Sequence, residues 1–174
     1  NKIIHVKNPR VGLVNIGAEA AKGSTLTKAA YDLLEQSHLN FTGNVEAREV
    51  PKGACDVIVK DGFTGNVLLK LTEGLAWNIL QVIKQRFTDG VKAKLGAALL
   101  LDKIKGLKKE FDYSEYGGAP ILGVRGPIVK MHGSSNANAV KNTILKGIPY
   151  VSEHVVDKIQ NSVLEIEEIT LSEY

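Results

Sequence analysis

The sequence predicts an α/β protein with a doubly wound, mostly parallel sheet flanked by helices. Strand-like runs alternate with stretches that carry apolar residues at helical spacing, which is the order of an α/β fold. The strand-like runs are apolar almost throughout, as expected for strands covered on both faces. The chain has 174 residues, so we expect one α/β domain over residues 1–174.

The amino-acid composition excludes several classes of function. Apolar residues make up 44% of the chain and its 17 glycines are dispersed, which is typical of a globular protein. A net charge of +3 is too weak to indicate a nucleic-acid partner. The single cysteine, Cys55, allows no internal disulfide and favours a reducing, cytoplasmic compartment. Cys55 and the four histidines show no ligand spacing, so we expect no metal.

The first half of the chain alternates strands and helices. Residues 10–17 read as a buried strand that runs into glycine, and residues 25–37 carry a helical stripe. Residues 38–44 are expected to form a short second strand, followed by a loop that holds Pro51. Residues 55–62 are β-branched and apolar and predict a third strand.

The second half begins with a long helix, expected over about residues 67–87. A more basic helix over about 91–111 follows, and then a loop over 112–126. Residues 127–133 predict a fourth strand. A last helix is expected to start near residue 134 and to continue to about Glu168.

The strand ends are expected to form the binding site. In parallel sheets, ligands gather beyond the carboxyl ends of the strands. Four loops rich in Gly, Asn, Ser and Lys are predicted to meet at that edge. Two of them contain the same five residues, FTGNV, at 41–45 and 63–67. The repeat suggests that two neighbouring strands face one ligand.

The first loop, GAEAAKGS, favours an anion such as phosphate. Gly17, Gly23 and Ser24 lie just before a helix N-terminus, where backbone N–H groups and the helix dipole attract negative charge. Lys22 would add a full charge. The spacing matches neither a Walker loop nor a dinucleotide fingerprint. The alternative is a tight turn with a solvated lysine.

The second copy of FTGNV offers polar groups for a phosphate or an acyl carbonyl: Asp61, Thr64, Gly65 and Asn66. The alternative is structural, because Asn66 suits a helix N-cap and Asp61 suits a turn. The first copy contributes Asn44, and Arg48 follows it. Arg48 could contact an anion or pair with a neighbouring glutamate.

The fourth loop, HGSSN, is a further strand-to-helix junction. Either Ser134 or Ser135 suits an N-cap, and Asn136 follows them. His132 could act as a general acid or base, or be a hydrogen-bonded residue at a strand end. There is no G-x-S-x-G elbow that would indicate a serine hydrolase.

The segment over residues 91–111 is basic and amphipathic. Six lysines surround an apolar run at residues 97–101. Such a helix suits an anionic membrane, an acidic partner or packing in a dimer.

Several long segments together resemble one family. VGLVNIGAEAAKG, NFTGNVEAR, DGFTGNVLLK, YSEYGGAPILGVRGP and HGSSNANAVKN are similar to segments of the bacterial acyl-ACP:phosphate acyltransferases, the PlsX family. The resemblance covers nearly the whole chain and corresponds to the C-terminal part of a longer protein. It implies a fold akin to isocitrate dehydrogenases and phosphotransacetylases, with a protruding helical pair at about residues 88–111.

The resemblance also implies a reaction. Inorganic phosphate attacks the thioester of a fatty acyl chain on acyl carrier protein, and acyl phosphate is formed for phospholipid synthesis. It implies no cofactor, a homodimer, and contact with the membrane surface or with the membrane glycerol-3-phosphate acyltransferase. Two alternatives stay open: a phosphotransacetylase that uses acyl-CoA, and a non-catalytic module that binds acyl phosphate or the carrier.

The residues at the strand ends fit this chemistry. Phosphate is itself a nucleophile, so the site needs a cradle for it and donors for the oxyanion. We expect Lys22 and its loop to hold phosphate, and Asn66 to serve either task. His132 is the candidate acid for the leaving thiolate.

Overall fold

A computed structural model describes residues 6–110, 115 and 117–172. Contacts group the chain into two compact units, of which the first ends at Gln81 and the second begins at Val82. The expectation of one domain with a protruding segment stays a prediction.

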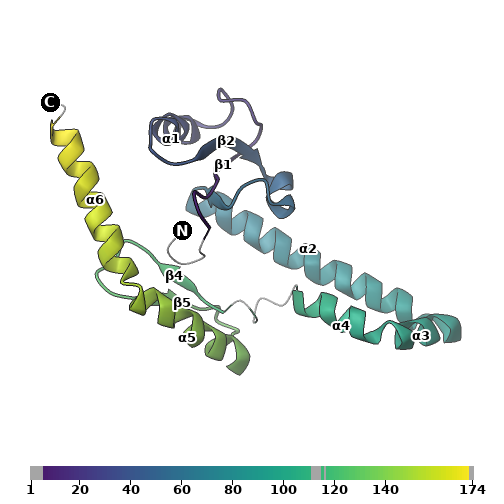
Figure 1. The fold of residues 1–174 in the computed structure, drawn as a ribbon. Helices are drawn as coiled ribbons and strands as arrows, with labels where there is room; N and C mark the ends of the chain where they lie inside the picture. Colours follow the sequence, from purple (N-terminus) through teal and green to yellow (C-terminus); the bar gives the residue numbers. More distant parts are fainter. Residues whose placement is uncertain (1–5, 111–114, 116, 173–174) are drawn as a thin grey trace. The chain divides into compact units, whose positions relative to one another are not determined.

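The first unit contains a parallel sheet of three strands in the order β2-β1-β3. The strands are β1 (Val11–Asn15), β2 (Phe41–Glu46) and β3 (Val57–Val59). Helix α1 (Thr25–Glu35) connects β1 to β2 and packs against both (Figure 1). The predicted α/β class is therefore confirmed.

The core of this unit surrounds β1, whose five residues are all buried. Leu13 is 2% exposed and lies at its centre. A Cβ on Gly12 would lie 2.5 Å from Val45 Cγ2 and 2.9 Å from Cys55 Sγ. Glycine is therefore needed where β1 meets its neighbours, and Cys55 lies against this core.

A cluster of hydrogen bonds around Arg10, here called the clasp, fixes the start of β3. Arg10 donates hydrogen bonds to the carbonyl oxygens of Gly53 and Ala54 and forms an ion pair of 3.0 Å with Asp56. The hydrogen bonds that Arg10 donates to the Asp56 carboxylate lower the pKa of Asp56 and raise that of Arg10. The clasp ties together two segments that are distant in the sequence.

The first copy of FTGNV lies inside β2, as the predicted strand over residues 38–44 implies, and not in a loop at the strand end. Gly43 has a φ of +90°. The register of β1 against β2 shifts between Val11 and Leu13. Such a bulge lets a polar segment continue the strand.

The second copy lies inside helix α2 (Gly62–Thr88), which begins at Gly62 rather than near Val67. Asp61 accepts a hydrogen bond of 2.8 Å from the Thr64 N–H and therefore caps the helix. Asn66 lies beyond the first turn, so its predicted capping role was wrong. The expected loop after β2 is in part a 3₁₀ helix, η1 (Ala47–Lys52).

The second unit starts within the last turns of α2, and two short helices follow where one was expected. They are α3 (Gly90–Leu99) and α4 (Leu101–Glu110), and Leu100 lies between them outside helical geometry. Leu95 and Leu99 are 63% and 88% exposed. No helix among the described residues is long and apolar enough to span a bilayer.

The rest of the second unit is a hairpin and two helices (Figure 1). Strands β4 (Ala119–Ile121) and β5 (Ile128–Lys130) pair antiparallel, and α5 (Ala137–Ser152) packs on β4. The predicted fourth strand therefore pairs with a segment expected to be a loop. Helix α6 (Val155–Ser172) follows a turn at His154, whose φ is +51°.

Candidate active site

A pocket lies at the carboxyl ends of β1, β2 and β3. It is lined by residues that follow or end the three strands and by the first turns of α1 and α2. Five of the predicted site residues are among them. The lining residues are Val14, Asn15, Ile16, Gly23, Ser24, Thr27, Glu46, Ala47, Arg48, Asp61, Thr64 and Leu68.

The loop from Gly17 to Ser24 is fixed to the sheet by two buried asparagines. Asn15 Nδ2 donates to the Lys22 carbonyl at 3.0 Å and to Asn44 Oδ1 at 3.1 Å. Asn44 Nδ2 donates to the Glu19 carbonyl at 2.8 Å. The side chain of Asn44 thus contacts the loop rather than the pocket, which it does not line.

The start of α1 forms one wall of the pocket. Ser24 is the N-cap and accepts a hydrogen bond of 3.2 Å from the Thr27 N–H. The Thr27 hydroxyl donates to the Ser24 carbonyl at 3.0 Å. Gly23, with a φ of +96°, makes the turn into the helix. Two hydroxyls and a helix N-terminus therefore face the pocket, and these groups suit an anion.

The start of α2 forms the opposite wall. The Thr64 hydroxyl and N–H both donate to the Asp61 carboxylate. These bonds lower the pKa of Asp61, first through the hydroxyl and then through the backbone N–H. Asp61 is therefore an anion at neutral pH, and its oxygens cap α2.

Arg48 also lines the pocket, but its charge is paired. Its guanidinium lies 3.1 Å from a Glu46 carboxylate oxygen and 3.5 Å from Glu49. Of the two roles that the sequence leaves open, the structure shows the ion pair with glutamate. An anion in the pocket would have to compete with Glu46 for Arg48.

Lys22, Gly17, Gly65 and Asn66 lie beside the pocket rather than in its lining. The side chain of Lys22 is exposed and lies over Gly17, at whose position a Cβ would be 3.1 Å from Lys22 Cγ. Asn66 is exposed on α2. Lys22 adjoins Gly23 in the wall, so its flexible charge is adjacent to the pocket.

The HGSSN loop belongs to the second unit. His132 Nδ1 lies 2.6 Å from Ser134 Oγ and accepts from the Ser134 N–H at 3.3 Å. Asn136 caps α5 by accepting from the Ala139 N–H at 2.9 Å. The predicted cap at Ser134 or Ser135 was therefore wrong by one or two positions. Roles in catalysis for His132 and its neighbours stay predictions.

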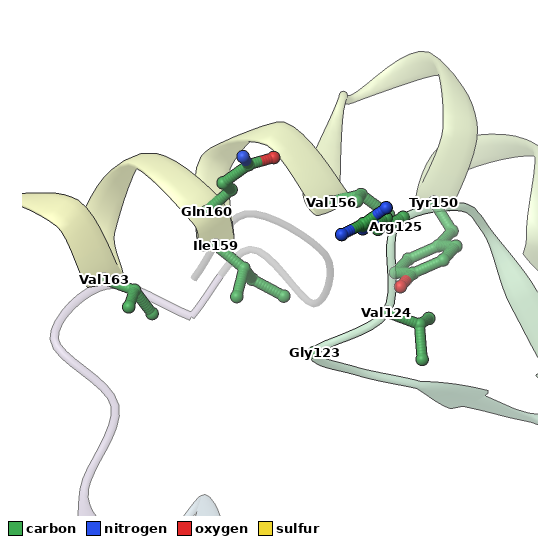
Figure 2. Close-up of a pocket in the computed structure, with 8 residues that line it drawn as sticks. All are labelled: Gly123, Val124, Arg125, Tyr150, Val156, Ile159, Gln160 and Val163. Carbon is green, nitrogen blue, oxygen red and sulfur yellow. The ribbon is translucent and has the colours of Figure 1, made fainter.

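A second pocket lies in the same unit and was not predicted. The turn at Gly123 and Val124 lies opposite Ile159 and Val163 of α6 (Figure 2). Tyr150 closes one end, and its hydroxyl donates to the Ile121 carbonyl at 3.2 Å. The remaining lining residues are Arg125, Val156 and Gln160.

Sequence reasoning missed Asn15 and Thr27, which contribute as much to the first pocket as the residues it named. The signal for Asn15 was its place at the end of a buried strand, directly before the glycine loop. Among the described residues, no group of three or more His, Cys, Asp or Glu could hold a metal ion. The first pocket thus combines two helix starts, hydroxyl groups, the ion-paired Arg48 and the carboxylates of Glu46 and Asp61.

Comparison with known proteins shows the family of the chain. The family model for fatty acid synthesis proteins matches residues 1–158, and the chain belongs to that family. The chain is 52% identical to a phosphate acyltransferase of Brevibacillus brevis over 161 residues, and 51% identical to one of Alkaliphilus oremlandii over 162. These alignments cover 92% and 93% of this chain and 48% of each relative. The chain therefore spans about half the length of the curated relatives it matches.

Proposed function

We propose that this chain carries the phosphate-binding part of a phosphate acyltransferase. In the proposed reaction a phosphate oxygen attacks the carbonyl carbon of an acyl thioester on acyl carrier protein. The C–S bond breaks, acyl phosphate forms, and the carrier thiolate leaves and takes a proton. This reaction would supply acyl phosphate for phospholipid synthesis.

One observation supports this proposal most strongly. The N-terminal turns of α1 and α2 face one pocket at the carboxyl ends of three parallel strands. Helix N-termini attract anions, and this edge is the usual ligand site of such sheets. The relatives are named phosphate acyltransferase, and in the proposed reaction the bound anion is the phosphate that is acylated.

The residues divide the work in this proposal. The loop from Gly17 to Ser24 holds phosphate with its N–H groups, and Lys22 adds a charge. Asn66, one turn into α2, donates to the oxyanion that forms on the thioester carbonyl. Preorganised donors of this kind lower the barrier because they need no reorganisation during the reaction. A leaving thiolate needs little help, so His132 is at most an auxiliary acid.

The test is acyl phosphate formation by the intact protein. We expect turnover to depend on inorganic phosphate. We also expect Lys22→Ala to lower the turnover number on the order of 10²-fold. Lys28→Ala is the matched control, because it removes another exposed lysine from the same loop–helix region. Unchanged turnover in Lys22→Ala would contradict the assignment. A preference for acetyl-CoA over long-chain acyl carrier protein would favour the phosphotransacetylase.

The basic segment is proposed to bring the enzyme to an anionic membrane. Leu99 is 88% exposed on α3, and lysines precede and follow it. Each lysine near an anionic surface contributes about 1 kcal/mol. Wild type should sediment with anionic vesicles at low salt, and Leu99→Glu should not. Homodimer formation and contact with a membrane acyltransferase are proposed with it.

A further inference from the structure

We propose that Asn44 and Asn15 are positioning residues that set the affinity for inorganic phosphate, an inference that rests on the proposed function. The two amides connect β2, β1 and the loop from Gly17 to Ser24 in one chain of hydrogen bonds. Neither residue contacts phosphate in this scheme. They act through the backbone of the loop.

Both asparagines are buried, and each side-chain oxygen and nitrogen of the pair makes at least one hydrogen bond. Asn15 is 9% exposed and Asn44 is 8% exposed. Asn15 Nδ2 donates twice, to the Lys22 carbonyl and to Asn44, and its Oδ1 accepts from the Ile16 N–H at 2.8 Å. Asn44 Oδ1 accepts from Asn15, and its Nδ2 donates to the Glu19 carbonyl. These groups therefore serve the loop rather than a ligand.

The hydrogen bonds fix the direction of loop N–H groups. In a trans peptide the C=O and the following N–H point in opposite directions. Holding the Lys22 carbonyl on Asn15 therefore sets where the Gly23 N–H points. Gly23 lines the pocket, and a Cβ at its position would lie 2.5 Å from Asn15 Oδ1. The loop thus closes directly onto the asparagine that orients it.

The chemistry needs an amide at both positions. Asn44 must accept from Asn15 and donate to Glu19 at the same time, which serine or alanine could not do at this reach. An aspartate would keep the shape and the acceptor. Its carboxylate would then face the Glu19 carbonyl, and two acceptors would repel each other. Asn44→Asp therefore breaks one bond of the chain with little change in volume.

The control is Thr42→Val on the same strand. The Thr42 hydroxyl donates to the Val11 carbonyl at 3.1 Å and does not contact the loop. Both variants remove one hydrogen bond between β2 and another part of the unit. A purely structural role for Asn44 would make the two variants alike in their kinetics.

The experiment measures the steady-state kinetics of the intact protein. The concentrations of inorganic phosphate and of long-chain acyl carrier protein are varied separately. We expect Asn44→Asp to raise the KM for phosphate on the order of tenfold or more, because small misplacements of a binding loop are costly. The KM for the acyl donor should change less than about twofold under the same reasoning. Thr42→Val should leave both constants as in wild type.

Hydrogen exchange supplies a second measurement. The Lys22 N–H donates to the Glu19 carbonyl at 3.0 Å, inside the loop that Asn44 holds. Its exchange should become faster in Asn44→Asp and stay unchanged in Thr42→Val. Should Asn44→Asp fail to fold, Asn44→Ser, which adds no charge, replaces it with the same expectations.

Several outcomes would overturn the inference. They are an unchanged phosphate KM in the folded Asn44 variant, an equal rise in Thr42→Val, or unchanged exchange at Lys22. A wild-type protein that forms no acyl phosphate would instead overturn the proposed function. In that case hydrogen exchange alone would still show whether Asn44 holds the loop.

Discussion

The two copies of FTGNV have the same five residues and opposite conformations. Residues 41–45 lie in β2, where Asn44 is buried and Gly43 has a positive φ. Residues 63–67 lie in α2, where the equivalent Asn66 is exposed and Gly65 is helical. Both copies nevertheless belong to segments that border the candidate phosphate site.

The difference shows that flanking residues decide the conformation of such a pentapeptide. Asp61 precedes the second copy and caps a helix, and a long helical sequence follows. The first copy pairs with β1 and is followed by a turn that contains Pro51. Propensity is weak within the five residues, so capping and strand pairing prevail.

The largest expected difference lies between the two asparagines. Asn44→Ala would remove two hydrogen bonds, one with the buried Asn15 amide and one with the Glu19 carbonyl, and would leave a cavity beside Asn15. It should lower the free energy of unfolding by about 2–3 kcal/mol. Asn66→Ala should change it by less than about 0.5 kcal/mol, because the side chain is exposed. Urea unfolding of both variants measures this.

Turnover number should show the reverse order. Asn66→Ala should reduce kcat on the order of 10²-fold if it removes an oxyanion donor. Asn44→Ala should reduce kcat less. A large loss of stability in Asn66→Ala, with normal turnover, would mean that the second copy is structural as well.

The two glycines give the next largest effect. Gly43→Ala forces a Cβ into a positive φ and should cost about 1–2 kcal/mol. Gly65→Ala adds a better helix former and should stabilise by up to about 1 kcal/mol. The Cβ at residue 65 would meet only the flexible end of Lys60. Thermal unfolding with opposite signs for the two variants would confirm the contrast.

The two threonines should differ less. Thr42→Val removes a hydrogen bond to the Val11 carbonyl and should cost about 1 kcal/mol. Thr64→Val should be milder, because its N–H still donates to Asp61. Equal destabilisation in chemical unfolding would show that the cap of α2 depends on the hydroxyl.

The smallest expected effect is that of Asp61→Asn on the free energy of unfolding, and it should appear only at acidic pH. The pKa of Asp61 is lowered in the folded state from the ordinary value of 3.8, so the unfolded chain takes up the proton first. Its stabilising contribution is therefore full above that value and is lost as pH falls through the folded pKa. Asp61→Asn should flatten this part of the stability–pH curve. An unchanged curve would assign the acid sensitivity to other carboxylates, such as Asp56.

Local patterns in the sequence predicted much of the fold. The strand at residues 10–17 and the helix at 25–37 follow from the pattern of apolar residues, and both are present as β1 and α1. The start of α2 was misplaced because two capping candidates, Asp61 and Asn66, stood close together. Only the actual hydrogen bond distinguishes them.

The candidate site was harder to predict than the fold. Asn15 and Asn44 are 29 positions apart, and their mutual hydrogen bond depends on the pairing of β1 with β2. The antiparallel pair β4–β5 likewise depends on contacts that periodicity does not encode. Residue type indicated that the loops after β1 and β3 border a pocket, but not which of their side chains line it.

The central place of β1 has a consequence for synthesis on the ribosome. β1 leaves the ribosome before both strands that flank it, and Arg10 waits for Asp56, 46 positions later. At about 5–20 residues per second, that delay lasts on the order of 2–10 s. Until β2 and then β3 have left the ribosome, β1 lacks the strands that flank it in this unit, and its apolar residues are open to nascent-chain chaperones. The most buried strand of this sheet is therefore the one that depends on two later strands for its pairing.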